Sequence, residues 1–109
     1  MNIPFLPEWK ERMLSGRKTH TCRSRKYGEP GERFEIFGAT FELVSVRKAT
    51  LEEVRDNYWY QEGCDSRAGF EEVWEKIHPG RGFVATDVRW LHEFKKVGAD
   101  IAKRINVIE

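Results

Sequence analysis

A segment near the N-terminus, Gly16–Arg23, carries the residue types that could do chemistry. In a strand that begins near residue 19 the side chains alternate, so Thr21 and Arg23 point to one side and Cys22 to the other, with Lys18 at the corner. A hydroxyl, an ammonium and a guanidinium would then converge on one bound anion or carbonyl. The alternative is a solvated basic surface in which Thr21 only favours the strand.

A second segment with chemical potential begins with three consecutive aromatic residues, Tyr58–Tyr60, in a predicted loop. The rings of Trp59 and Tyr60 either belong to the core or offer a stacking surface for a base. The carboxylate of Glu62 follows them and could orient Lys18 or exchange a proton with a substrate. Both a structural and a ligand-binding role therefore stay open for the aromatic rings.

The two cysteines, Cys22 and Cys64, follow no secretion signal and are expected to be reduced thiols. With His20 and His78 they could form a zinc site, but the sequence contains no CxxC or HxxxH pair. Ordinary buried thiols are the interpretation that this spacing favours. The sequence thus predicts no metal and no other cofactor.

The composition indicates one folded domain over residues 1–109. Hydrophobic residues make up 39% and aromatic residues 13%, too many for a disordered chain, while 34% charged residues argue against a membrane-embedded protein. No apolar run is long enough for a transmembrane helix, and no signal peptide is recognisable, so we expect a cytoplasmic protein. The formal net charge of +1 confines any anion binding to local patches.

Hydrophobic periodicity, capping residues and turn signals predict the elements that must position these side chains. A short helix opens at Pro7 and ends at Gly16. The further predicted elements are a strand over Thr19–Arg23, a hairpin of Arg33–Phe37 and Thr40–Ala49, a helix from Leu51 to about Asn57 behind a Thr50/Glu53 capping box, a helix capped by Ser66 with an apolar stripe of Phe70, Val73, Trp74 and Ile77, a strand over Phe83–Trp90 that continues, bent, through Phe94, and a terminal helix near Ala99–Ile105. Their order favours an α+β domain with a small mixed β-barrel and peripheral helices over a helical bundle.

The ordered combination of these motifs resembles the ASCH domain family of the PUA-like superfamily. The motifs are Gly16-x-Lys18-Thr19-x-Thr21-x-Arg23, a glycine-rich turn that enters strands, Gln61-Glu62-Gly63, and an aromatic-bearing helix that ends in Pro-Gly. The resemblance covers the chain up to about Phe94. It implies a PUA-like fold with a cleft beside the Gly-x-Lys segment, in a family usually proposed to bind RNA.

Some small bacterial members of that family are amidohydrolases that remove the acetyl group from 4-acetylcytidine. By position, the resemblance implies Lys18 as base, Thr21 as nucleophile and Glu62 as acid. For that chemistry, burial or a nearby cation such as Arg23 must lower the pKa of Lys18. This chain departs from the small enzymes in its triple aromatic run and in an extension from about residue 95.

The resulting expectation is a cleft that binds RNA or a nucleotide-like ligand. The expected ligand-binding residues are Gly16, Arg17, Lys18, Thr21, Arg23, Trp59, Tyr60 and Glu62, of which Lys18, Thr21 and Glu62 are catalytic if the protein is an enzyme. The alternatives are an amidohydrolase acting on an acylated nucleoside and an accessory protein-interaction module, suggested only by the C-terminal extension.

Basic residues outside the cleft could form one phosphate-facing side despite the near-neutral total charge. The residues in question are Arg17, Arg23, Arg25, Lys26, Arg47, Lys48 and Arg81, with Lys95, Lys96, Lys103 and Arg104 in the extension. The alternative for these charges is a solvated, mixed surface.

Overall fold

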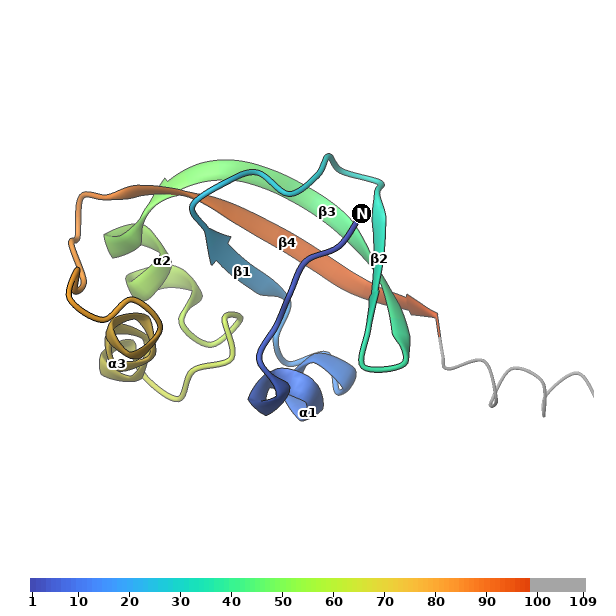
Figure 1. Cartoon of the computed structure of the whole chain (residues 1–109), viewed down its shortest axis with the longest axis horizontal. Helices are drawn as coiled ribbons and strands as arrows, with labels where there is room; N and C mark the ends of the chain where they lie inside the picture. The colour runs from blue at the N-terminus through green and yellow to red at the C-terminus, as the bar shows by residue number, and fades with distance from the viewer. Residues whose placement is uncertain (99–109) are drawn as a thin grey trace, which may run out of the picture.

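The computed structural model describes residues 1–98, in which helices flank a curled sheet (Figure 1). The elements in chain order are the 3₁₀ helix η1 (Pro7–Trp9), α1 (Lys10–Leu14), β1 (His20–Arg23), β2 (Arg33–Ile36), β3 (Ala39–Thr50), α2 (Leu51–Tyr58), α3 (Arg67–Ile77) and β4 (Val88–Gly98). The strands pair in the order β1-β4-β3-β2, and each of these pairs is antiparallel. The predicted α+β class with a small barrel-like sheet is confirmed.

The predicted hairpin between β2 and β3 is present, but its turn consists of Phe37 and Gly38, one residue earlier than the predicted strands implied, because Ile36 pairs with Ala39. Both residues have positive φ angles, 56° and 75°, as a tight two-residue hairpin turn with the right twist requires. The two long strands β3 and β4 then pair over most of their length and carry β1 along the far edge of β4. The sheet thereby fixes the position of the segment that contains Thr21.

An aromatic cluster fills the concave side of the sheet. Phe34 from β2, Phe41 from β3 and Phe94 from β4 are each at most 2% exposed, and their ring centroids lie 5.4 to 5.6 Å apart. Phe5 joins them from the N-terminal segment, 6.0 Å from Phe34 and 5.8 Å from Phe94. The N-terminal segment is therefore anchored to the sheet by ring contacts, which also places the start of the chain beside β1.

Both helix starts that were predicted from capping residues are confirmed. The Thr50 hydroxyl accepts a hydrogen bond from the Glu53 N–H at 3.2 Å, and the Ser66 hydroxyl accepts one from the Gly69 N–H at 2.9 Å. Each cap satisfies a backbone donor that the first helical turn leaves without a partner. Of the predicted apolar stripe on α3, Phe70 and Trp74 are buried.

The last strand differs from the prediction at both ends. It was expected to begin at Phe83, but residues 83–87 form a loop, because the carbonyls of Ala85 and Asp87 accept hydrogen bonds from the first N–H groups of α2. Those carbonyls therefore cap a helix instead of joining a ladder. At its other end β4 runs past Phe94 to Gly98 and pairs with the start of β3.

The predicted extension from about residue 95 is consequently part of the sheet as far as Gly98. The terminal helix predicted near Ala99–Ile105, together with Lys103 and Arg104, lies outside the described residues. Within residues 1–98, no helix has the length and apolar character needed to cross a membrane.

Candidate functional site

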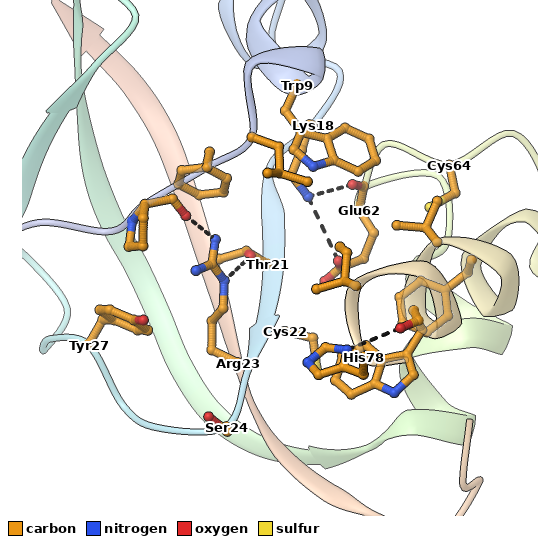
Figure 2. Close-up of a pocket in the computed structure, with 17 residues that line it drawn as sticks. Trp9, Lys18, Thr21, Cys22, Arg23, Ser24, Tyr27, Glu62, Cys64 and His78 are labelled. Carbon is orange, nitrogen blue, oxygen red and sulfur yellow. Dashed lines mark hydrogen bonds and ion pairs between the residues drawn. The ribbon is translucent and has the colours of Figure 1, made fainter. Parts of the chain in front are cut away.

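A cavity of about 440 Å³ opens between the N-terminal segment, β1 and α3 (Figure 2). That volume is typical of sites for small organic ligands. Its polar lining includes four residues that the sequence singled out, namely Lys18, Thr21, Arg23 and Glu62. The structure thus brings together two segments that are some forty residues apart in the chain.

Lys18 is the most deeply buried cation of the site, with 3% of its surface exposed. Its Nζ donates hydrogen bonds to the carbonyl of His20, at 2.8 Å, and to the carbonyl of Glu62. The ammonium also lies 4.7 Å from the ring centroid of Trp9. Two carbonyls and an aromatic face therefore hold the amine in one orientation inside the cavity.

Glu62 faces Lys18 across the cavity wall, with Oε1 3.8 Å from Nζ (Figure 2). Its backbone is fixed by the neighbouring residue Gln61, whose carbonyl accepts hydrogen bonds from the N–H groups of Thr19 and His20. The other carboxylate oxygen, Oε2, is buried without a hydrogen-bond partner within residues 1–98. An unpaired buried acceptor in a cavity is a place for a ligand donor.

Burial changes the acid-base behaviour of this pair. It raises the pKa of Glu62 to about 7, against the opposing charges of Lys18 and Arg23. It also lowers the pKa of Lys18, which the charge of Glu62 partly counteracts. The two shifts bring the pKa values of an acid and a base closer together, a pattern that recurs at acid-base sites.

Thr21 and Arg23 form the second polar unit of the cavity. Arg23 donates from Nε to the Thr21 hydroxyl at 2.9 Å and from Nη2 to the carbonyl of Pro4, and its guanidinium lies 4.8 Å from the ring centroid of Phe5. The guanidinium would therefore stabilise negative charge that develops on the Thr21 oxygen during a reaction. The alternation of the strand predicted that both side chains point to one side, toward a bound ligand, but it did not predict the hydrogen bond between them.

The apolar walls of the cavity come from residues that the sequence did not single out as ligand-binding. Trp74 on α3 and His78, the residue that follows α3, stack with ring centroids 4.0 Å apart. Phe5, Trp9, Tyr27 and Phe70 also belong to the aromatic lining. Sequence reasoning assigned the stripe on α3 to the core. The signal that could have indicated more was the Trp74-x-x-x-His78 spacing, which places both rings on one helix face.

Four of the predicted ligand-binding residues lie outside the cavity lining: Gly16, Arg17, Trp59 and Tyr60. Arg17 donates to the carbonyl of Cys64, pairs with Asp65 at 3.3 Å, and stacks its guanidinium 4.6 Å from the Tyr60 ring. Trp59 is half-buried against the core. The aromatic run thus packs on the outside of the loop that carries Glu62, and the ring surfaces facing the cavity come from other elements.

Of the four residues considered for zinc, Cys22, Cys64 and His78 line the cavity, whereas His20 lies outside its lining. His20 stacks on Tyr58 with ring centroids 5.1 Å apart, and His78 stacks on Trp74. Burial raises the pKa of Cys22, and it raises that of Cys64 to about 11, so both are protonated thiols at neutral pH. Within residues 1–98, no three histidine, cysteine or acidic side chains group as metal ligands, and both cysteines are free.

A buried histidine fixes the rim of the cavity. His92 on β4 is fully buried, and its Nε2 accepts a hydrogen bond from the Tyr27 N–H at 3.1 Å. Its Nδ1 lies 3.1 Å from the carbonyl of Trp90 and 3.3 Å from that of Thr21, so the neutral ring protonated on Nδ1 satisfies both nitrogens. Protonation of Nε2 would remove the acceptor that holds the Tyr27 backbone.

This arrangement predicts that His92 contributes less stability in acid. Burial lowers the pKa of His92 below its usual 6.5, so the unfolded chain binds its proton first as the pH falls. The contribution of His92 to the free energy of unfolding should therefore decrease below pH 6.5, until the folded ring also titrates. Glu62, whose pKa burial raises, acts in the opposite direction over the same range, so the measurement is the difference in free energy of unfolding between wild type and His92→Gln. Urea unfolding at pH 7 and pH 5 should show that this difference shifts against the wild type as the pH falls. An NMR titration that gives His92 a pKa at or above 6.5 would contradict the prediction.

Comparison with known proteins adds a fold relationship. No protein-family model and no curated protein matches the sequence. Among solved structures, an ASCH domain from Lactobacillus crispatus superposes with a TM-score of 0.72 at 17% identity, over 89% of this chain and 79% of that one. A mutant ASCH protein from Zymomonas mobilis superposes with a TM-score of 0.63 at 16% identity, over 97% of this chain and 80% of that one. A protein from Enterococcus faecalis superposes with a TM-score of 0.63 at 20% identity, over 84% of this chain and 71% of that one. At these identities, the likeness concerns the fold.

Proposed function

We propose that the cavity of this chain, which has the fold of ASCH-domain structures, binds a nucleotide-like ligand, either free or within RNA. The observation that carries the proposal is the unpaired Oε2 of Glu62, buried in an aromatic-lined cavity beside Lys18. A nucleobase offers a flat π-face and a polar edge with N–H donors. The cavity offers the complementary surfaces, aromatic walls and a buried acceptor.

In the proposed complex the two kinds of wall have separate roles. His78, whose ring covers Trp74, and Tyr27 present aromatic surfaces against which a base packs. The Oε2 atom of Glu62 accepts a hydrogen bond from an exocyclic amine, which supplies the missing partner. Arg23 lies at the other end of the polar lining and is placed to meet a ribose oxygen or a phosphate.

The test uses the titration of Glu62. Because the ionised carboxylate accepts from the amine, cytidine affinity should rise between pH 6 and pH 8, as Glu62 loses its proton near a pKa of about 7. Calorimetric titration of the protein with cytidine measures this. In Glu62→Gln the affinity should be weaker at pH 8, by roughly tenfold, and independent of pH over that range.

Glu52→Gln provides the matched control, because Glu52 is exposed on α2 and absent from the cavity lining. It should leave both the affinity and its pH dependence unchanged. Absence of cytidine and cytidine monophosphate binding, or an unchanged pH dependence in Glu62→Gln, would contradict the proposed function.

A second candidate function, hydrolysis of an acylated nucleoside, is favoured by the shifted pKa values of Lys18 and Glu62. In that reaction neutral Lys18 takes the proton of the Thr21 hydroxyl as its oxygen attacks the acyl carbonyl. The resulting oxyanion is stabilised by Arg23, and protonated Glu62 gives its proton to the departing amine. Water then cleaves the acyl ester on Thr21, which releases the acid and restores the hydroxyl.

The geometry without substrate sets a condition on this hydrolytic function. Lys18 Nζ is hydrogen-bonded to two carbonyls, and the Thr21 hydroxyl is hydrogen-bonded to Arg23. A proton transfer from Thr21 to Lys18 therefore requires a bound substrate that brings these two side chains together. Apo sites often tighten only when substrate is present. The cation of Arg23 favours the deprotonated Thr21 oxygen, which the reaction also needs.

Incubation with 4-acetylcytidine tests this candidate, with cytidine release followed by chromatography. Wild-type protein should release cytidine, Thr21→Ala should lose activity by roughly a hundredfold or more, and Thr21→Ser should retain part of it because it keeps the hydroxyl. Release that persists at the wild-type rate in Thr21→Ala would exclude the threonine as nucleophile. Absence of release by the wild-type protein would exclude hydrolysis of this substrate and leave the binding function standing.

A further inference from the structure

Two half-buried aromatic rings, Tyr27 and Trp90, lie away from Lys18 and Glu62, and each has two cations close to its ring. Lys26 and Lys48 place their ammonium groups 5.5 and 5.3 Å from the ring centroid of Trp90. Arg25 and Arg23 place their guanidinium groups 4.0 and 5.5 Å from the ring centroid of Tyr27. We call these six residues the Tyr27–Trp90 surface.

The Tyr27–Trp90 surface is continuous with the cavity. Arg23 and Tyr27 line the cavity itself, on the side away from Glu62 (Figure 2). Across the sheet, Trp90 on β4 is the register partner of Arg23 on β1 and of Lys48 on β3. Arg23, which lines the cavity, and Trp90 are therefore direct neighbours across the β1–β4 pair.

The positive charge of this surface is largely unneutralised. Lys26 pairs with Glu29, but the ion pairs within residues 1–98 leave Arg23, Arg25 and Lys48 without a carboxylate partner. In contrast, Arg33, Arg47, Arg55 and Arg81, elsewhere on the molecule, are paired with acidic side chains. Within residues 1–98, five lysine and arginine side chains have no carboxylate partner, and three of them belong to this surface, the other two being Lys10 and Lys96.

We propose that the Tyr27–Trp90 surface binds the phosphate backbone and a neighbouring base of a single-stranded nucleic acid whose terminal or exposed nucleotide occupies the cavity. This proposal rests on the function proposed above. Cations that track a backbone, alternating with rings on which bases stack, are the combination by which proteins bind single strands. The natural ligand is accordingly an oligonucleotide, and a free nucleoside occupies only part of the site.

The experiment compares short and long ligands. Fluorescence anisotropy follows a labelled 12-nucleotide single-stranded RNA, the same sequence as DNA, and competition by cytidine monophosphate, each at several salt concentrations. The RNA or the DNA should bind more tightly than the mononucleotide, and the logarithm of its affinity should fall steeply with the logarithm of salt. The tighter of the two oligonucleotides identifies the natural strand, through its response to the 2′-hydroxyl.

Lys48→Gln should weaken oligonucleotide binding roughly three- to tenfold and reduce the salt slope by about 0.7, the value for one phosphate contact on a single strand. Arg25→Gln combined with Lys48→Gln should weaken it further, while mononucleotide binding stays unchanged. Lys96→Gln is the matched control. The sequence analysis included Lys96 among the candidate phosphate-facing cations, but in the structure it is an exposed lysine near the end of β4 that lies away from Trp90. It should have no effect.

The outcomes separate this proposal from the function on which it rests. If the mononucleotide binds but neither oligonucleotide binds more tightly, or if Lys48→Gln behaves like Lys96→Gln, the strand-binding proposal is wrong and the cavity function stands. If neither mononucleotide nor oligonucleotide binds, both are wrong. If oligonucleotide binding depends on Lys48 but not on Glu62, the surface is supported and the role of the cavity is refuted.

Discussion

Lys18→Met is expected to lower the free energy of unfolding by about 2–4 kcal/mol near pH 8, and by less near pH 6. The substitution removes the donor to two buried carbonyls and the positive charge beside Glu62. Without that charge the pKa of Glu62 in the folded protein rises further above 7, since only the opposing attraction of Lys18 is lost and the burial remains. The stability difference from wild type therefore depends on pH.

The direction follows from proton linkage. The folded variant holds the Glu62 proton more tightly than the unfolded chain, whose carboxyl has its usual pKa of 4.5, so its stability falls as pH rises toward the folded pKa. In the wild-type protein, the dependence of stability on the Glu62 proton ends near pH 7, because the folded carboxyl has lost its proton above its pKa of about 7. Above pH 7 the gap between wild type and variant should widen by up to about 1.4 kcal/mol per pH unit.

Urea unfolding at pH 6, 7 and 8 measures the gap, and the double variant Lys18→Met with Glu62→Gln is the control. Because glutamine does not titrate, the difference in free energy of unfolding between wild type and the double variant should lack the increase above pH 7 that Glu62 causes in Lys18→Met. A gap between wild type and Lys18→Met that is the same at all three pH values would mean that the two side chains are not coupled.

Gly63→Ala is the second substitution with a large expected effect, because the glycine lies where the Glu62 loop passes closest to Trp9. Its φ angle is +99°, and an added Cβ would lie 2.9 Å from a carbon of the Trp9 ring and 3.3 Å from Cδ of Lys18. The ring is buried in the core, so it cannot move away freely. We expect a destabilisation of about 2–4 kcal/mol, from backbone strain together with overpacking.

Gly38→Ala separates the two causes. Gly38 also has a positive φ angle, +75°, but nothing lies within 4 Å of a Cβ added there, so only the backbone strain is present. It should cost about 1–2 kcal/mol. Thermal or urea unfolding of both variants gives the difference, and Gly63→Ala should also weaken cytidine binding because it displaces Lys18. Equal destabilisation by the two substitutions would show that the structure accommodates the added Cβ beside Trp9 without a loss of folding free energy.

The fold was accessible from the sequence because the strongest signals are local. Thr50 and Ser66 cap their helices through donors three residues away, and the Phe37–Gly38 turn closes strands that follow each other directly. Where the signal required a partner elsewhere in the chain, the prediction was wrong. The expected strand over Phe83–Trp90 loses its first five residues because α2, thirty residues earlier, uses their carbonyls.

The polar half of the candidate site was likewise visible in the sequence. Alternation along β1 placed Thr21 and Arg23 on one side, with Lys18 at the corner, and all three line the cavity. The aromatic half could not be recognised in the sequence. An aromatic residue in the apolar stripe of a helix is predicted to be in the core, whether its ring faces other side chains or a cavity. Trp74 does both, as it is buried against Phe70 and also forms the cavity wall.

The sequence by itself therefore determined the helix starts, the hairpin, the α+β class and the set of polar groups, since capping, alternation and turn formation act over a few residues. Only the tertiary structure decided which rings enclose the cavity, how Glu62 meets Lys18 from forty-four residues away, and how far burial shifts their pKa values. Desolvation depends on everything that packs around a group, and no short segment carries that information.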